Sequence, residues 1–327
     1  TYTLTLGPLR IAPHAIIEGV GTSRTVIDGN GEAFVFRDGD FARLTFRHLV
    51  IRNGQTGIIG FGSDLIVEDC VIEDNLGSGI NAVGGSVTVR RSIIRRNVTA
   101  GTGGGIHVED GVDLRITDSS ITDNHADGGG GGIAQMIGSF RIERSTIANN
   151  STDGDGGGLH LDNPFSGALI NSTVSGNHAD GNGGGLYMAT TDYSSVTRKA
   201  LANATIANNT AGNGGGIYLT AEDPAKSLVA RNSIIAGNHT LSMVDDNAPT
   251  LTSSDCIGIL TSQGFNLIGD TTGCTIDGVA TGNRLNVDPL LGPLADNGGA
   301  TMTHALLDGS PAIDRGRPKT PGTGPAT

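Results

Sequence analysis

Short apolar segments recur along the chain at a near-constant spacing. Nine times an aliphatic residue stands three positions before an asparagine, and successive asparagines are 22 to 32 residues apart. The aligned asparagines are Asn30, Asn53, Asn75, Asn97, Asn124, Asn150, Asn177, Asn209 and Asn238. Small residues form a second column two positions before these aliphatic residues, and this period of two predicts a short strand with one inward face.

Each repeat contains two further strand patterns. One carries an aliphatic column at Val67, Val89, Ile116, Ile142, Leu169, Leu201 and Ala230, and the other opens at Ile80, Ile106, Ile133, Leu159, Leu186 and Ile217. Three strands per repeat at a fixed period do not fit a sandwich. They predict an all-β coil in which every strand pairs in parallel with its equivalent one turn on, at ~4.8 Å per rung. We therefore predict a parallel β-helix of about nine or ten rungs with an irregular C-terminal cap.

The asparagine column has a structural explanation. Asparagine tolerates a left-handed backbone at a corner, and stacked amides bond from rung to rung, so we predict a ladder rather than a binding site. Glycine triplets form a second column, at Gly103–Gly105, Gly130–Gly132, Gly156–Gly158, Gly183–Gly185 and Gly214–Gly216. Five copies without a Lys-Ser/Thr ending argue against phosphate binding and predict a positive φ at one corner of each rung.

The composition excludes several classes of function. The 327 residues carry a formal charge of −12, which argues against nucleic acid as a partner. Glycine is abundant, at 53 residues, and tryptophan is absent, so the core must be aliphatic. No apolar run has the length of a membrane span.

The repeat resembles bacterial surface proteins with polymorphic-outer-membrane-protein-like β-helix repeats, on its Asn column and its Gly-Gly-Gly-Ile elements. The C-terminal part resembles the choice-of-anchor Q domain, at residues 262–270, 288–299, 303–307 and 309–314. The resemblance implies a single-stranded, right-handed, pectate-lyase-like solenoid at a bacterial cell surface. Residues 1–240 are then rungs, 241–318 are the C-terminal rungs and cap of the same solenoid, and 319–327 are a linker.

Three cysteines fit an exported protein. Cys256 and Cys274 flank an irregular segment, and we predict a disulfide that closes this loop. Cys70 falls in an inward column of small residues, so we expect it to be buried, reduced and inert.

Charges of opposite sign alternate on outward positions of neighbouring rungs. Glu68 and Asp69 precede Arg90 and Arg91 by one repeat, for example. We expect solvated pairs that fix the register of the strands.

A candidate ligand-binding face lies where the repeat breaks. The connections that follow the third strand of each repeat become longer toward the C-terminus. We expect them to form a wall along one edge of the coil, beside outward-facing histidine and tyrosine side chains. The candidate residues are His107, His160, Tyr187, Tyr218, Asp192, Tyr193, Arg198 and Lys199. Rings with charged neighbours suit carbohydrate, although outward Tyr and His also suit strands in general.

Carboxylates after the asparagine column suggest a possible calcium site, since calcium takes several oxygen ligands. The candidates are Asp127, Asp153, Asp155 and Asp180. No other cofactor is expected.

Three functions fit the sequence. The first is a non-catalytic rod at the cell surface, an adhesin or glycan-binding module whose partner is an extracellular glycan or another cell. The second is a lyase or hydrolase of an extracellular polysaccharide, with Arg198 or Lys199 and Asp192 as guesses for the chemistry. The third is a filament subunit that associates end to end. The fold alone does not choose among them, and we favour the first.

Overall fold

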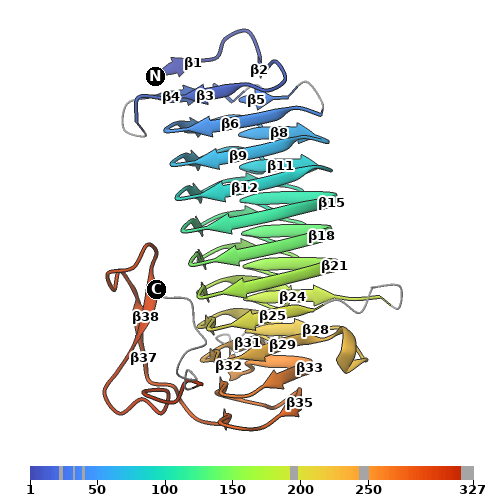
Figure 1. The fold of residues 1–327 in the computed structure, drawn as a ribbon, viewed down its shortest axis with the longest axis vertical. Helices are drawn as coiled ribbons and strands as arrows, with labels where there is room; N and C mark the ends of the chain where they lie inside the picture. The colour runs from blue at the N-terminus through green and yellow to red at the C-terminus, as the bar shows by residue number, and fades with distance from the viewer. Residues whose placement is uncertain (22–24, 32–33, 39–40, 192–197, 243–249, 318–327) are drawn as a thin grey trace, which may run out of the picture.

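The strands wind into a coil whose rungs stack along one axis (Figure 1). This computed structural model describes residues 1–21, 25–31, 34–38, 41–191, 198–242 and 250–317. Equivalent strands of successive rungs pair in parallel: Ile72 lies opposite both Ile51 and Ile94. The columns that open at Val67 and at Ile80 pair in the predicted register. The fold is the predicted parallel β-helix.

Three sheets line the coil within the described residues. The 12-stranded sheet, here sheet A, contains β1 (Tyr2–Thr3), β4 (Val26–Asp28), β7 (Val50–Arg52), β10 (Val71–Glu73), β13 (Ile93–Arg95), β16 (Ser120–Thr122), β19 (Thr146–Ala148), β22 (Thr173–Ser175), β26 (Thr205–Ala207), β30 (Ile234–Ala236), β34 (Leu267–Ile268) and β36 (Arg284–Leu285). The seven-stranded sheet, here sheet C, contains β14 (Val98–Thr99), β17 (His125–Ala126), β20 (Ser151–Thr152), β23 (His178–Asn182), β27 (Thr210–Asn213), β31 (His239–Ser242) and β32 (Thr250–Ser253).

The 17-stranded sheet, here sheet B, closes the third side. Its strands are β2 (Leu9–Arg10), β3 (Ile16–Glu18), β5 (Phe36–Arg37), β6 (Arg43–Arg47), β8 (Ile58–Phe61), β9 (Asp64–Glu68), β11 (Ile80–Val83), β12 (Ser86–Arg90), β15 (Ile106–Thr117), β18 (Ile133–Glu143), β21 (Leu159–Ile170), β24 (Leu186–Ala189), β25 (Lys199–Ala202), β28 (Ile217–Leu219), β29 (Leu228–Arg231), β33 (Cys256–Gln263) and β35 (Cys274–Val279). A short 3₁₀ helix, η1 (Pro224–Lys226), precedes β29.

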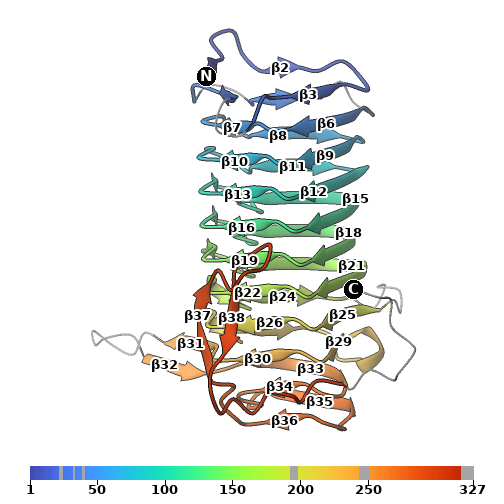
Figure 2. The same ribbon diagram turned by 60° about the vertical axis from the view of Figure 1, so that its left-hand side comes forward.

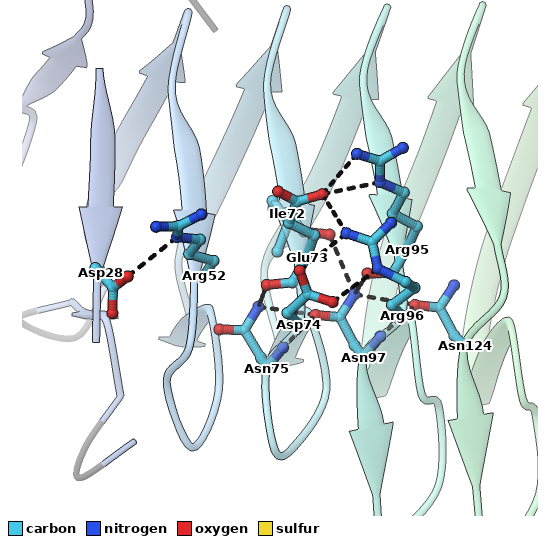
Figure 3. Close-up of polar contacts among 10 residues, drawn as sticks. All are labelled: Asp28, Arg52, Ile72, Glu73, Asp74, Asn75, Arg95, Arg96, Asn97 and Asn124. Atoms are coloured by element: carbon cyan, nitrogen blue, oxygen red, sulfur yellow. Dashed lines mark hydrogen bonds and ion pairs between the residues drawn. The ribbon is translucent and has the colours of Figure 1, made fainter. Parts of the chain in front are cut away.

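Stacked asparagines join the rungs inside the corner between sheets A and C (Figure 3). The side-chain Nδ2 of Asn75 donates to Oδ1 of Asn97 over 2.8 Å, and Asn97 donates in the same way to Asn124 over 2.9 Å. The backbone N–H of each asparagine donates to the same acceptor. The ladder continues through Asn150, Asn177, Asn209 and Asn238, and ends on the carboxylate of Asp255. Buried amide groups are thereby satisfied on every rung.

Two of the nine predicted asparagines do not join this ladder. Asn53 is one residue out of register, because Ile51 and not Val50 pairs with Ile72, which places Gly54 below Asn75. Asn53 instead occupies the adjacent corner position, with φ of 53°, and its side chain donates to Asp28. Asn30 is exposed, and its backbone N–H donates to Asp28.

A second ladder lines the other end of the sheet A strands from β10 to β22. The backbone N–H of Cys70 donates to Oγ of Ser92, and Ser92 donates to Ser119 in the same way. Cys70 is buried and free, and burial raises the pKa of its thiol to about 11, as expected for an inert cysteine.

Left-handed corner residues on both sides of sheet A carry the charge pairs. Asp69 and Arg91 both have positive φ, and the two side chains form a two-point ion pair across one rung. Arg96 contacts both Asp74 and Glu73 (Figure 3). Hydrogen bonding to Arg91 lowers the pKa of Asp69. The predicted alternation of charge is confirmed.

The glycine triplets play two roles. Only the first glycine of each has positive φ, for example Gly103 at 68° and Gly130 at 65°. A Cβ on the third would lie 2.6 Å from a carbonyl oxygen of the next rung, as Gly105 does against Gly132. The first glycine therefore permits the corner, and the others permit close stacking.

The coil continues beyond the last asparagine, because β33 to β36 add further rungs. The predicted disulfide is present between Cys256 and Cys274, on β33 and β35.

Residues 286–317, here the strap, leave the last rung and run back along the outside of sheet A (Figure 2). The strap contains the antiparallel pair β37 (Leu291–Ala295) and β38 (Thr303–Leu306). Thr146 Oγ1 donates to the carbonyl of Met302, and His304 Nε2 lies 2.9 Å from Ser175 Oγ. The backbone N–H of Arg317 reaches Asn232. The C-terminal segment thus covers the side of the coil rather than its end.

Candidate ligand-binding face

Sheet B places one column of the predicted residues on its outer surface. The register brings His107, Ala134, His160, Tyr187 and Tyr218 to equivalent positions on successive rungs. Each lies between two buried residues of its strand, as Tyr187 does between Leu186 and Met188, so its side chain points outward.

Three of these residues form a stack of rings. The ring centroids of His160 and Tyr187 are 4.8 Å apart, and those of Tyr187 and Tyr218 are 5.8 Å apart with an interplanar angle of 22°. Burial raises the pKa of the Tyr187 hydroxyl, and the nearby Asp155 and Asp162 raise it further. Tyr187 lies between the rings of His160 and Tyr218. A ligand would therefore contact the ring edges and the polar groups of this stack.

His107 is separate from this stack. Ala134 lies between it and His160 in the column. Its Nδ1 is 2.8 Å from Thr102 Oγ1 and its Nε2 is 3.6 Å from Glu109. Burial lowers the pKa of His107, and Glu109 opposes this effect in part.

Part of the predicted wall, formed by residues 190–191 and 220–226, lies beside the last two rings. A cleft is lined there by Thr190, Thr191, Thr220, Ala221, Glu222, Asp223 and Lys226. Asp223 caps η1, its carboxylate accepting from the backbone of Ala225. Arg198 is exposed immediately before β25. Asp192 and Tyr193 lie outside the described residues.

Lys199 was expected on this wall, but it is fully buried. It stands two positions before the inward Leu201, and the two-residue period of a strand turns both side chains into the coil. Its ammonium has no hydrogen-bond partner among the described residues. Burial lowers the pKa of Lys199, and Lys226 lowers it further. Lys199 therefore offers no charge to a ligand on the surface.

The four predicted calcium ligands divide into different environments. Asp127 and Asp153 gather around His125 on the outer surface of sheet C. Asp180 lies 3.0 Å from His178 on a neighbouring rung. Asp155 instead joins two rungs, since its Oδ1 accepts from both the backbone and the side chain of Asn182.

The imidazoles of His125 and His178 were not assigned as ligands from the sequence. A usable signal was present, because a histidine and an aspartate two positions apart on a strand point to the same side. His125-Ala126-Asp127 and His178-Ala179-Asp180 both have this spacing.

Comparison with known protein families shows which family this chain belongs to. The profile described as "Right handed beta helix region" matches residues 14–140 and 43–201, which together cover more than half of the chain. The chain belongs to the right-handed β-helix family. Comparison with curated proteins and with solved structures gives no match for this β-helix protein. In the part of the chain that the structure describes, no helix has the length and hydropathy to cross a bilayer.

The family match ends before the strap and before Tyr218. The resemblance of the C-terminal part to choice-of-anchor Q domains, and that of the repeats to polymorphic outer-membrane proteins, stay predictions.

Proposed function

We propose that this β-helix protein is a secreted cell-surface module that binds glycan through the outer face of sheet B. The stack of His160, Tyr187 and Tyr218 carries the proposal. It is an outward, half-buried set of rings on a rigid sheet, beside a cleft with polar walls. Such a face supplies apolar area together with fixed hydrogen-bonding groups, as carbohydrate recognition requires.

The charge of this face favours a neutral glycan. Asp155 and Asp162 act electrostatically on Tyr187, and the cleft is lined by two acidic residues, Glu222 and Asp223, and one basic residue, Lys226. The whole chain carries a net charge of −12. Polysaccharides rich in uronate would be repelled at low salt.

An oxidising compartment agrees with this role. The Cys256–Cys274 disulfide ties two rungs together, and structural disulfides persist mainly in exported proteins. This supports the cell-surface localisation that we propose.

The test is binding to an array of neutral and acidic glycans, with Tyr187→Ala and Tyr218→Ala as the variants. We expect binding of neutral glycans and a loss of at least about tenfold in affinity for each variant. Tyr2→Ala removes an exposed tyrosine at the far end of the coil and is the control. Binding that survives both sheet B substitutions would refute the proposed face.

The same glycans are followed for new reducing or unsaturated ends. We expect none. Their release by the wild-type protein would instead identify it as a polysaccharide-cleaving enzyme.

A further inference from the structure

Sheet C carries a cluster of metal-ligating side chains on the outside of two adjacent rungs. Nε2 of His125 lies 3.3 Å from Oδ1 of Asp127 and 3.8 Å from Oδ1 of Asp153. The three ligand atoms lie within 4.8 Å of one another. A divalent ion bound at ~2.1 Å to each ligand needs separations of about 3 to 4 Å, so small rotations of these partly exposed side chains suffice.

The imidazole of His125 is oriented for this role. Its Nδ1 lies 2.9 Å from Oγ of Ser151, on the next rung. When Nδ1–H donates to that hydroxyl, the lone pair of Nε2 faces the two carboxylates. Hydrogen bonding of the remote nitrogen is how metal-binding histidines are usually held. His178 repeats this geometry, with Nδ1 2.9 Å from Thr210 and Nε2 facing Asp180.

The charge pattern of sheet C differs from that of sheet A in a way that points to a cation. Acidic corner residues of sheet A face arginines of a neighbouring rung, as Asp69 faces Arg91 and Asp118 faces Arg144. On sheet C, three successive rungs present Asp127, Asp153 and Asp180. The only ion-pair partners that the described residues give these aspartates are imidazoles. Like charges on adjacent strands are destabilising, and a bound cation would relieve that repulsion.

We propose that His125, Asp127 and Asp153 bind one first-row transition-metal ion, Zn²⁺ in particular, which joins the rungs of β17 and β20. One imidazole nitrogen and two carboxylate oxygens are zinc ligands, and water completes the coordination. Calcium prefers six to eight oxygen ligands and is therefore the weaker occupant. This site is independent of the proposed glycan-binding face.

The experiment is titration of the full, untagged chain with Zn²⁺ alone, by competition against a chromophoric chelator. We expect one equivalent of Zn²⁺ per chain, with affinity reduced at least about tenfold in His125→Ala and Asp153→Asn. Ser151→Ala removes the hydroxyl that orients the ring, and we expect a loss of about tenfold. Co²⁺ supplies an absorption spectrum that reports mixed nitrogen and oxygen ligation.

His239→Ala is the matched control. His239 occupies the same column of sheet C, but Leu241 stands two positions after it, so it has no equivalent carboxylate. We expect its affinity for Zn²⁺ to equal that of the wild type. Absence of saturable Zn²⁺ binding, an equal loss in His239→Ala, or stronger binding of Ca²⁺ than of Zn²⁺ would each overturn the proposal.

Discussion

The middle rungs, residues 64–150, and the later rungs, residues 186–260, share the buried asparagine ladder but differ in their outer corner residues. Both contain the asparagine ladder, through Asn97 in the first region and Asn209 in the second. In the middle rungs the corner columns hold arginine–carboxylate pairs, whereas in the later rungs the equivalent corner stacks neutral amides, Asn203 on Asn232. Buried hydrogen bonds thus specify the coil, and the outer surface is free to change.

The substitution with the largest expected effect on stability removes a residue of the asparagine ladder. Asn124→Ala leaves the backbone N–H and the side-chain Nδ2 of Asn97 without their common acceptor, and both are buried. The backbone N–H of Asn97 is then unsatisfied, and the carbonyl of Ile94 loses its donor from Asn124. Nδ2 of Asn97 keeps the carbonyl oxygens of Ile72 and Arg95. We expect a loss of about 2 to 4 kcal/mol of unfolding free energy. Chemical denaturation followed by circular dichroism measures the loss.

Ser119→Ala is the control for that substitution. Ser119 accepts one backbone N–H, from Ser92, and the same column holds Ala204 naturally. We expect a loss of about 1 to 2 kcal/mol. Equal losses of unfolding free energy in the two variants would show that the asparagine ladder contributes no more to stability than the serine ladder.

The second test concerns the buried lysine of the later rungs. Lys199→Met removes an unpartnered ammonium from the interior while keeping most of the volume. We expect a gain of about 1 to 3 kcal/mol at neutral pH. Denaturation midpoints at several pH values measure it.

The gain should shrink as pH rises. The pKa of Lys199 is lowered in the folded protein, so between that pKa and the ordinary value near 10.4 the unfolded chain binds the extra proton. Stability of the wild type therefore rises with pH across that window, toward that of the variant. Arg198→Met, at an exposed neighbour, should show no such convergence; a difference independent of pH for Lys199→Met would contradict the assignment.

The smallest effect is expected at the corner pairs of the middle rungs. Asp69→Asn keeps a residue that tolerates the left-handed backbone but removes the charge that faces Arg91. The pair is partly exposed, so the loss should stay below about 1 kcal/mol and decrease at high salt.

This loss also depends on pH. Because the folded pKa of Asp69 is lowered, its contribution is present above about pH 4 and disappears as pH falls through the folded pKa. A comparison of variant and wild type at pH 7 and pH 3 measures it. An undiminished difference at pH 3 would point to a cause other than the ion pair.

The repeat in the sequence predicts the coil, the parallel register of its strands and most of the ladder, because each depends on contacts between equivalent residues. Register within a single repeat is less well specified. Adjacent Val50 and Ile51 both fit the aliphatic column. Aligning Val50 with the column, when Ile51 is the residue that pairs with Ile72, placed Asn53 in the ladder one position out of register. Lys199 was misplaced for a different reason: it was assigned to the connection that forms the wall, whereas β25 begins at Lys199 and its distance of two residues from Leu201 turns it inward.

Contacts that do not repeat were beyond the pattern. Asp255 ends the asparagine ladder only 17 residues after Asn238, whereas successive asparagines of the repeat are 22 to 32 residues apart. The strap contacts Thr146 and Ser175 from Met302 and His304, across more than 120 residues of sequence. The outward rings were predicted correctly as a column, but the ring-to-ring stacking that fixes their exposed edges required coordinates.

The strap changes how this molecule can come apart. In a simple solenoid each turn touches only its neighbours, and the ends fray one turn at a time. Here the strap, which follows the last turn, is hydrogen-bonded to rungs near the middle of the coil, at Thr146 and Ser175. The terminal turns can unfold only after these contacts of the strap are broken. A force applied to the C-terminal end therefore acts on the middle rungs as well as on the last ones.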